Sequence, residues 1–223
     1  MSTPRDTQIS CPKCGKKFEV TIFRSVNTDL SPDLSEKIVS GKLFEAECPS
    51  CGFVSHLEYD LLYSDLKHSA WIWVCHPNDE AYDVNVSQIR GGLVPPGFTT
   101  RMVSDMNELR EKAACLEAGV DDRVIELCKM ALAMNLAAEM PEFQLKKVYY
   151  TFDGIEHGLL FYDSSWKAVR VTLDREHYEI MAELFKKLLE EEKPEPYQII
   201  DSRWAADMFD RLDGEDQKGS GVL

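Results

Sequence analysis

The sequence predicts an α+β protein whose first part is a zinc-ribbon-like β core held together by four cysteines. Three observations support this prediction. Two short cysteine motifs share one plan, alternating apolar segments flank them, and helical patterns then lead to a β-hairpin signal in the last third of the chain. The expected order is therefore the four-cysteine β core with an inserted helix, two following helices, a β-meander and C-terminal helices.

The composition is that of an ordinary soluble globular protein. The chain has 223 residues, of which 44% are hydrophobic and 29% charged. No apolar run approaches the roughly 18 residues that a membrane-spanning helix needs. Residues 1–8 are polar and lack the apolar segment of a secretory signal. We therefore expect a cytoplasmic protein that does not engage a membrane.

The net charge bears on the class of partner. The chain holds 25 basic and 39 acidic residues, which gives a formal charge of −14. A protein this acidic repels a phosphate backbone unless a local basic face overrides the global field. Broad nucleic-acid binding is therefore disfavoured, and a protein partner of unknown identity is expected instead.

Two cysteine pairs carry the clearest chemistry. A spacing of two residues between cysteines lets one tight turn direct both sulfurs at a single ion, and a following glycine supplies the positive φ that closes the turn. Two such turns together make a tetrahedral site of four thiolates, which suits zinc. The pairs are Cys11-Pro12-Lys13-Cys14-Gly15 and Cys48-Pro49-Ser50-Cys51-Gly52.

The expected zinc is structural, because four thiolates leave no open position for a substrate. A Cys-Pro-x-Cys motif also occurs in thiol–disulfide redox proteins, where the pair begins a helix that lowers the pKa of the first thiol. Here residues 18–23 follow the first pair and alternate as a strand does. The redox interpretation also leaves the second pair unexplained, so structural zinc is favoured.

The remaining cysteines and the histidines are given no site. Cys75, Cys115 and Cys128 lie in apolar strand or helix patterns, where free cysteine usually fills the core. The histidines show no metal-ligand spacing and no recognisable catalytic motif. They are His56, His68, His76, His157 and His177.

In the first part of the chain, strands are expected near residues 18–24, 53–59 and 66–75. Pro32 favours the first turn of a helix that runs to about Ser40, and Gly41 ends it. Residues 98–103 form a further expected strand. Asp105 with Glu108 resembles a capping box for the next helix. We thus expect a β-rich core with one helix between the two cysteine pairs.

In the second part, Asp121 and Asp122 favour the start of a helix that stops before Pro141. Asp153-Gly154 is a favoured turn between strands at 147–152 and 155–162, and a third strand is expected at 166–173. Asp174 caps a long helix that continues to about residue 192. A last helix begins near residue 202, and beyond Gly214 the small polar tail is expected to be disordered.

The order of several blocks resembles the CpXC-domain proteins of bacteria and archaea. Besides the two cysteine motifs, the blocks are Val26-Asn27-Thr28, Pro32-Asp33-Leu34, Ile38-Val39-Ser40-Gly41-Lys42-Leu43, Leu61-Leu62-Tyr63-Ser64-Asp65, Leu109-Arg110-Glu111-Lys112 and residues 119–127. The resemblance covers about residues 9–136 and implies metal ligation by the four paired cysteines, with no assigned activity or catalytic residue. The expected domains are a CpXC zinc-ribbon-like domain at 9–136, a β-meander with helices at 141–213, and a tail at 214–223.

Three functions follow from these observations. The first is an interaction or regulatory protein with a structural zinc site at Cys11, Cys14, Cys48 and Cys51, which fits the acidic surface. The second is a nucleic-acid-binding zinc ribbon that uses basic side chains near the first cysteine pair. The basic residues are Lys13, Lys16, Lys17 and Arg24, with Phe18 and Phe23 between them.

The third is an enzyme of unknown activity, and whether the chain is an enzyme stays open. Its candidate site is the charged cluster of Asp121, Asp122, Arg123 and Glu126, since neighbouring carboxylates beside an arginine shift each other's pKa. Helix capping by Asp121 and a solvated ion pair of Arg123 explain the same residues more simply. No catalytic residue and no cofactor other than zinc is therefore predicted, and the sequence leaves the oligomeric state open.

Overall fold

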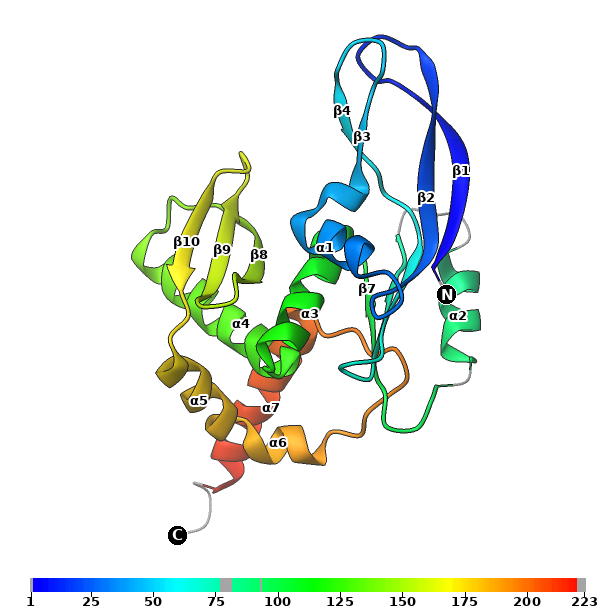
Figure 1. Cartoon of the computed structure of the whole chain (residues 1–223). Coiled ribbons are helices and arrows are strands. Elements are labelled where there is room, and N and C mark those ends of the chain that lie inside the picture. The colour runs from blue at the N-terminus through cyan, green and yellow to red at the C-terminus, as the bar shows by residue number, and fades with distance from the viewer. Residues whose placement is uncertain (1, 77–81, 93, 220–223) are drawn as a thin grey trace. The chain divides into compact units, whose positions relative to one another are not determined.

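The computed structural model describes residues 2–76, 82–92 and 94–219 (Figure 1). The strands are β1 (Thr3–Ser10), β2 (Lys17–Asn27), β3 (Glu45–Glu47), β4 (Val54–His56), β5 (Leu61–Asp65), β6 (Ala70–Val74), β7 (Thr99–Val103), β8 (Leu145–Phe152), β9 (His157–Asp163) and β10 (Ala168–Thr172). The helices are α1 (Pro32–Ser40), the short 3₁₀ helix η1 (Lys42–Phe44), α2 (Tyr82–Arg90), α3 (Met106–Ala118), α4 (Asp122–Glu139), α5 (Arg175–Leu184), α6 (Lys186–Glu191) and α7 (Ser202–Gly219).

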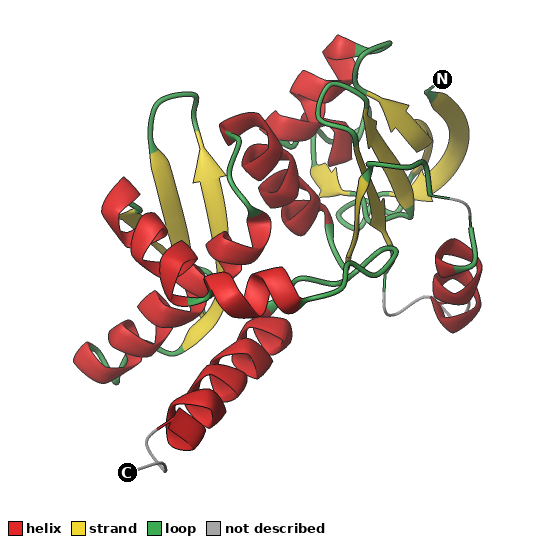
Figure 2. Cartoon of the chain, turned by 90° about the horizontal axis from the view of Figure 1, so that it is seen from below, coloured by secondary structure: helices red, strands yellow, loops and turns green. Residues whose placement is uncertain are grey.

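The chain divides into two compact units, each described here by itself. The N-terminal unit comprises Met1–Arg110 together with Pro196–Gln198, and the C-terminal unit comprises Glu111–Glu195 and Ile199–Leu223. Helices and strands occur in both units (Figure 2). The α+β class is therefore confirmed, while the arrangement of the strands differs from a simple ribbon.

The N-terminal unit is built on a five-stranded mixed sheet in the order β1-β2-β5-β6-β7. Only residues 25–27 of β2 pair with β5, whereas β1 pairs with β2 from Lys17 to Ser25. The first two strands therefore continue beyond the sheet as a two-stranded arm. A separate two-stranded sheet, β3 with β4, forms a second hairpin whose tip lies beside the tip of the arm (Figure 1).

A segment from the C-terminal part of the chain completes the other edge of this sheet. Gln198 forms a parallel bridge with Arg101 of β7, and its carbonyl accepts a hydrogen bond from the Met102 N–H at 3.3 Å. The Tyr197 N–H donates to the Thr100 hydroxyl at 2.8 Å, and the Tyr197 side chain is buried. Tyr197 has a positive φ of 54°, a conformation that burial of its ring holds in place.

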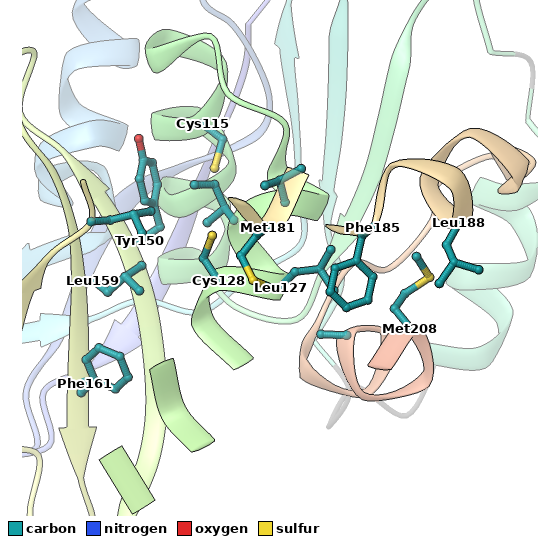
Figure 3. Packing of buried hydrophobic residues seen from close by; sticks show 14 residues of the cluster. Cys115, Leu127, Cys128, Tyr150, Leu159, Phe161, Met181, Phe185, Leu188 and Met208 are labelled. Atoms are coloured by element: carbon teal, nitrogen blue, oxygen red, sulfur yellow. The ribbon is translucent and has the colours of Figure 1, made fainter. Parts of the chain in front are cut away.

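The C-terminal unit packs helices on a three-stranded antiparallel sheet in the order β10-β9-β8. Cys128 of α4 lies near Leu159 and Tyr150 of the sheet, whereas Leu127 lies beside Phe185 (Figure 3), and Phe161 belongs to the same core. The remaining large side chains of this core come from the later helices and include Met181, Phe185, Leu188 and Met208. These positions recur at three- and four-residue spacing, so one face of each helix is buried.

Most of the expected helices and strands are present, with several differences. Strand β1 and helix α2 were not expected, nor was β5 as a strand separate from β6. The expected long helix after Asp174 is interrupted at Phe185, which separates α5 from α6. Helix α7 runs to Gly219, and residues 220–223 of the expected tail lie outside the described residues.

The capping residues act largely as the sequence predicts. Asp174 accepts a hydrogen bond from the His177 N–H at 2.8 Å and so caps α5. Asp105 accepts from the Glu108 N–H at 2.8 Å, but the Glu108 carboxylate bonds the Ser104 N–H, one residue earlier than a capping box requires. The carboxylates of Asp105 and Glu108 thus both accept backbone hydrogen bonds at the start of α3, and Glu108 bonds the residue before Asp105.

Gly41 ends α1 in the left-handed region, with φ at 81°, and Arg110 lies directly against it. A Cβ at this position would stand 3.3 Å from the Arg110 guanidinium, which also donates to the Val39 carbonyl at 3.0 Å. We expect Gly41→Ala to lower the free energy of unfolding by about 1–2 kcal/mol, because an L-residue is strained there. Urea unfolding followed by circular dichroism measures this change.

A matched control for this prediction is Gly214→Ala. Gly214 lies within α7, and nothing approaches the position of an added Cβ within 4 Å. Alanine is favoured over glycine inside a helix, so the control variant should be as stable as the natural protein or slightly more stable. Equal unfolding midpoints for Gly41→Ala and Gly214→Ala would contradict the role given to Gly41.

Candidate metal centre

The two cysteine motifs fold into turns with the same hydrogen bonds. In the first turn the Cys11 N–H donates to the Lys16 carbonyl at 2.9 Å, and the Gly15 N–H donates to the Cys11 carbonyl at 2.8 Å. In the second turn the Cys48 N–H donates to the Phe53 carbonyl at 2.8 Å, and the Gly52 N–H donates to the Cys48 carbonyl at 2.9 Å. The repeated sequence thus produces a repeated backbone.

Both turns depend on a glycine with positive φ, as the sequence predicts. The φ angle is 73° at Gly15 and 67° at Gly52. This region is open to glycine without the steric penalty that a Cβ introduces. The glycine lets the chain reverse immediately after the second cysteine of each pair, so that both sulfurs of a pair lie on the same side of the turn.

The four sulfurs meet at the tips of the two hairpins. The Cys11 and Cys51 Sγ atoms are 3.6 Å apart, the Cys14 and Cys48 Sγ atoms are 3.8 Å apart, and all four sulfurs lie within 4.8 Å of one another. Four ligands at a Zn–S distance of about 2.3 Å place tetrahedrally bound sulfurs roughly 3.8 Å apart. All four cysteines are free rather than paired as disulfides. The donor set and its spacing therefore fit a four-thiolate metal site.

The surrounding groups shift the pKa values of two of the thiols in opposite directions. Burial, the largest effect on Cys11, raises its pKa, but the backbone N–H groups of Cys14 and Lys13 outweigh it and lower the pKa to about 7. At Cys51 the Phe53 backbone N–H lowers the pKa, yet burial and the neighbouring sulfurs raise it to about 12. Four thiolates this close repel one another, and a divalent cation between them removes that repulsion.

The site is enclosed on one side and open on the other. Cys11 and Cys48 are buried, Cys51 is partly buried, and Cys14 is exposed. The first cysteine of each pair thus lies toward the interior of the hairpin tips. No histidine belongs to this cluster, and among the described residues it is the one group of cysteine, histidine or acidic side chains that could hold a metal ion.

The other cysteines fill the core, as expected. Cys75, Cys115 and Cys128 are each 1% exposed, and the last two belong to the hydrophobic core of the C-terminal unit. Burial raises the pKa of Cys128 to about 12, so its thiol stays protonated at neutral pH. Three histidines are held by neighbours instead of a metal: His68 by Asp65, His157 by Tyr150, and His177 by Asp174.

The basic residues proposed for nucleic-acid contacts are more exposed than their aromatic companions. Lys13, Lys16 and Lys17 are exposed near the tip of the arm and Arg24 is exposed further along β2, whereas Phe18 and Phe23 are partly buried. A single-stranded nucleic acid needs open aromatic faces on which bases can stack.

The cluster proposed for catalysis separates into two parts. Asp121 caps α4 through the Arg123 N–H and forms an ion pair with the Arg123 guanidinium at 2.6 Å. Hydrogen bonds from this guanidinium to Asp121 are also the main cause of the raised pKa of Arg123. Asp122 and Glu126 point elsewhere, to Lys112 at 3.1 Å and to Lys129 at 2.7 Å. The four residues therefore do not form one shared site.

The buried partners of Asp122 and Glu126 were missed by sequence reasoning. Glu111, Lys112 and Lys129 had no predicted role, yet all three are buried. Two features of the sequence indicate that these charges are buried. Glu126 and Lys129 have the three-residue spacing of a helical ion pair, and Lys129 lies in an otherwise apolar stretch of α4.

Comparisons with known proteins agree with this geometry. A family model described as CpXC protein matches residues 9–129, which is more than half of the chain and includes all four clustered cysteines. No curated protein and no solved structure matches the chain. None of the helices in the described part is long and apolar enough to cross a membrane.

Proposed function

The chain belongs to the CpXC family, and from this premise we propose that it is a zinc-stabilised interaction protein, with one structural zinc ion bound by its four clustered cysteines. The observation that carries the proposal is the convergence of four sulfurs, from two turns of identical hydrogen bonding, within 4.8 Å of one another. The ligands are Cys11, Cys14, Cys48 and Cys51.

Zinc is favoured by the donor set. Four thiolates are soft ligands that suit zinc or iron–sulfur chemistry, and tetrahedral coordination of a single zinc ion matches sulfur separations of 3.6 Å and 3.8 Å. A four-coordinate site has no vacant position for water or substrate. The ion would therefore stabilise the fold, and reduced cysteines of this kind fit a cytoplasmic location.

The ion would act on the part of the N-terminal unit that has the least packing of its own. Residues Asp6, Gln8 and Ser10 of β1 and Lys17 and Glu19 of β2 are all exposed. A two-stranded ribbon in water is marginally stable without a further layer. Joining the tips of both hairpins through one ion would hold the arm rigid, and a rigid arm suits a role in contacting another molecule.

A protein partner is favoured over a nucleic acid by the overall charge of −14. Strand β1 is also an edge strand of the five-stranded sheet in the described part of the chain, next to β2. Edge strands present backbone groups to which an extended segment of another chain can hydrogen-bond. The arm is therefore the surface we propose for partner binding.

Measuring the metal content tests the proposed zinc site. Protein purified without added metal should contain one zinc ion per chain, as measured by elemental mass spectrometry. Cobalt substitution should produce the visible absorption bands of a tetrahedral thiolate site. Cys48→Ser should lose most of the metal, while Cys128→Ala should retain it, because Cys128 lies in the core of the C-terminal unit. Retention of full metal by Cys48→Ser would exclude the site.

Partner capture tests the proposed binding of another protein. The natural protein should recover a protein partner in a stoichiometric amount, and Cys48→Ser should not. The alternative of a nucleic-acid-binding ribbon predicts instead that oligonucleotides bind at low salt, that salt weakens the binding, and that Lys16→Glu abolishes it. Lys16 is exposed beside the site, so this change leaves the sulfurs in place.

A further inference from the structure

Five charged side chains form a network inside the C-terminal unit. They come from two helices: Glu111 and Lys112 from α3, and Asp122, Glu126 and Lys129 from α4. Their side chains are between 2% and 13% exposed. Lys129 Nζ lies 3.0 Å from both Glu111 oxygens and 2.7 Å from Glu126 Oε2, and Lys112 Nζ lies 3.1 Å from Asp122 Oδ2.

Two backbone groups complete the network. The Tyr150 N–H of β8 donates to Glu111 Oε2 at 2.7 Å, and the Lys112 ammonium donates to the Ile200 carbonyl at 3.1 Å. Lys112 also stands 4.0 Å from Glu111 Oε1. The two lysines therefore find their acceptors on α3, on α4 and at Ile200, whereas the sheet contributes a donor to Glu111.

The charges in this network do not balance. Three carboxylates face two ammonium groups, so full ionisation leaves one negative charge in excess. An isolated buried charge costs several kcal/mol, and a carboxylate escapes that cost by binding a proton. The imbalance predicts that one of the three carboxylates is neutral in the folded chain.

The contacts identify which carboxylate this is. Glu111 receives two bonds from Lys129 and one from the Tyr150 N–H, and Asp122 is the most exposed of the three and pairs with Lys112. Glu126 contacts Lys129 through one oxygen only, and Lys129 already bridges both oxygens of Glu111. Glu126 is therefore the carboxylate with the weakest compensation for its burial.

Helix α7 also packs on α4, and its arginines have other partners: Arg203 bonds Asp201, and Arg211 Nη1 lies 3.3 Å from Met208 Sδ. Three titratable groups on the remaining elements carry no charge. From α5 the titratable group is Tyr178, whose hydroxyl accepts the Asp121 N–H, and from α3 it is the buried Cys115. From β8 it is Tyr150, whose hydroxyl is paired with His157. Burial raises the pKa of each of these three groups, so all three are neutral at physiological pH.

We propose that this network is a proton-sensitive switch in which Glu126 takes up one proton when the C-terminal unit folds, so that mild acid tightens the packing of α3 on α4. The bound proton comes from water and leaves two ammonium groups facing two carboxylates. Burial, the largest effect, and the nearby Glu111 raise the pKa of Glu126, although Lys129 and Lys112 oppose them.

The raised pKa of Glu126 determines how the stability of the folded chain changes with pH. A carboxylate whose pKa is higher in the folded chain than in the unfolded chain binds more protons when folded. Stability then rises as pH falls through the folded pKa and levels off below the ordinary value of 4.5. This trend is opposite to the usual loss of stability of proteins in mild acid.

Two measurements on the whole 223-residue chain test the proposal. Carbon-13 spectra of glutamate-labelled protein should show one carboxyl resonance that titrates well above the ordinary range and is missing from Glu126→Gln. The urea midpoint of the C-terminal unit, followed through hydrogen exchange of α4 amides, should rise for the natural protein between pH 7.5 and pH 5.5. For Glu126→Gln the midpoint should not change with pH over this range.

The control is Glu139→Gln, which changes an exposed glutamate at the other end of the same helix. This variant should keep both the elevated titration and the pH-dependent midpoint. The proposal is overturned if the Glu126 resonance titrates at or below the ordinary value, or if Glu126→Gln keeps the pH dependence of the natural protein. Failure of Glu126→Gln to fold at neutral pH also overturns it, since a neutral side chain is the folded form proposed here.

Discussion

Removing the metal is expected to unfold the two hairpins of the N-terminal unit while the C-terminal unit stays folded. Structural zinc in small thiolate sites has apparent binding free energies of about 10–16 kcal/mol, which is comparable to the stability of a whole domain. The arm of β1 and β2 has few buried residues, so little else opposes its unfolding. Hydrogen exchange measured with and without a strong chelator should show loss of amide protection in both hairpins.

The control for this result lies within the same molecule. Amides of α4, which belongs to the C-terminal unit, should keep their protection after chelation, and adding zinc back should restore the hairpins. Acid should act in the same direction as the chelator, because protonation of the thiols removes the ligands. Unchanged protection of the arm in metal-free protein would mean that the four sulfurs are not needed to hold it.

Lys129→Met is expected to destabilise the C-terminal unit more than any surface charge substitution. Lys129 is the shared partner of Glu111 and Glu126, both of which are buried. Methionine fills a similar volume but leaves the two carboxylates without their ammonium. Removing one partner of a buried ion pair costs about 3–5 kcal/mol. Urea unfolding at neutral pH should show a loss of this size.

Lys186→Met is the matched control, because Lys186 is exposed and forms a surface pair with Glu183 at 3.4 Å. Exposed pairs contribute about 0–1 kcal/mol, so this variant should unfold almost as the natural protein does. Adding Glu111→Gln to Lys129→Met should recover part of the stability, since the buried negative charge of Glu111 is then removed. A loss below about 1 kcal/mol for Lys129→Met would show that water reaches the network.

Local sequence chemistry was sufficient for the features that depend on neighbouring residues. The cysteine turns follow from two-residue spacing and a glycine, the end of α1 follows from Gly41, and the start of α5 follows from Asp174. Each of these is decided within about five residues, where turn geometry and capping operate. The convergence of the two turns was predictable because only four ligands complete a tetrahedral site.

Features that depend on distant partners were not predictable in the same way. Strand β1 has a polar sequence without clear alternation, and it is a strand because β2 supplies its hydrogen bonds. The neighbours of β5 are β2 and β6, and the pairing with β2 joins parts of the chain separated by a helix and a hairpin. Register and strand order arise from such long-range contacts, which a local pattern does not contain.

The sequence by itself determined the cluster of four cysteines that could hold a metal ion, because cysteine spacing and turn glycines encode the geometry of each turn locally. Only the tertiary structure decided which charges are buried. Asp121 and Glu126 look alike in the sequence, yet one caps a helix and the other lies against Lys129 in the interior. The physical reason is that solvation of a charge depends on every element packed around it, and those elements are brought together by folding.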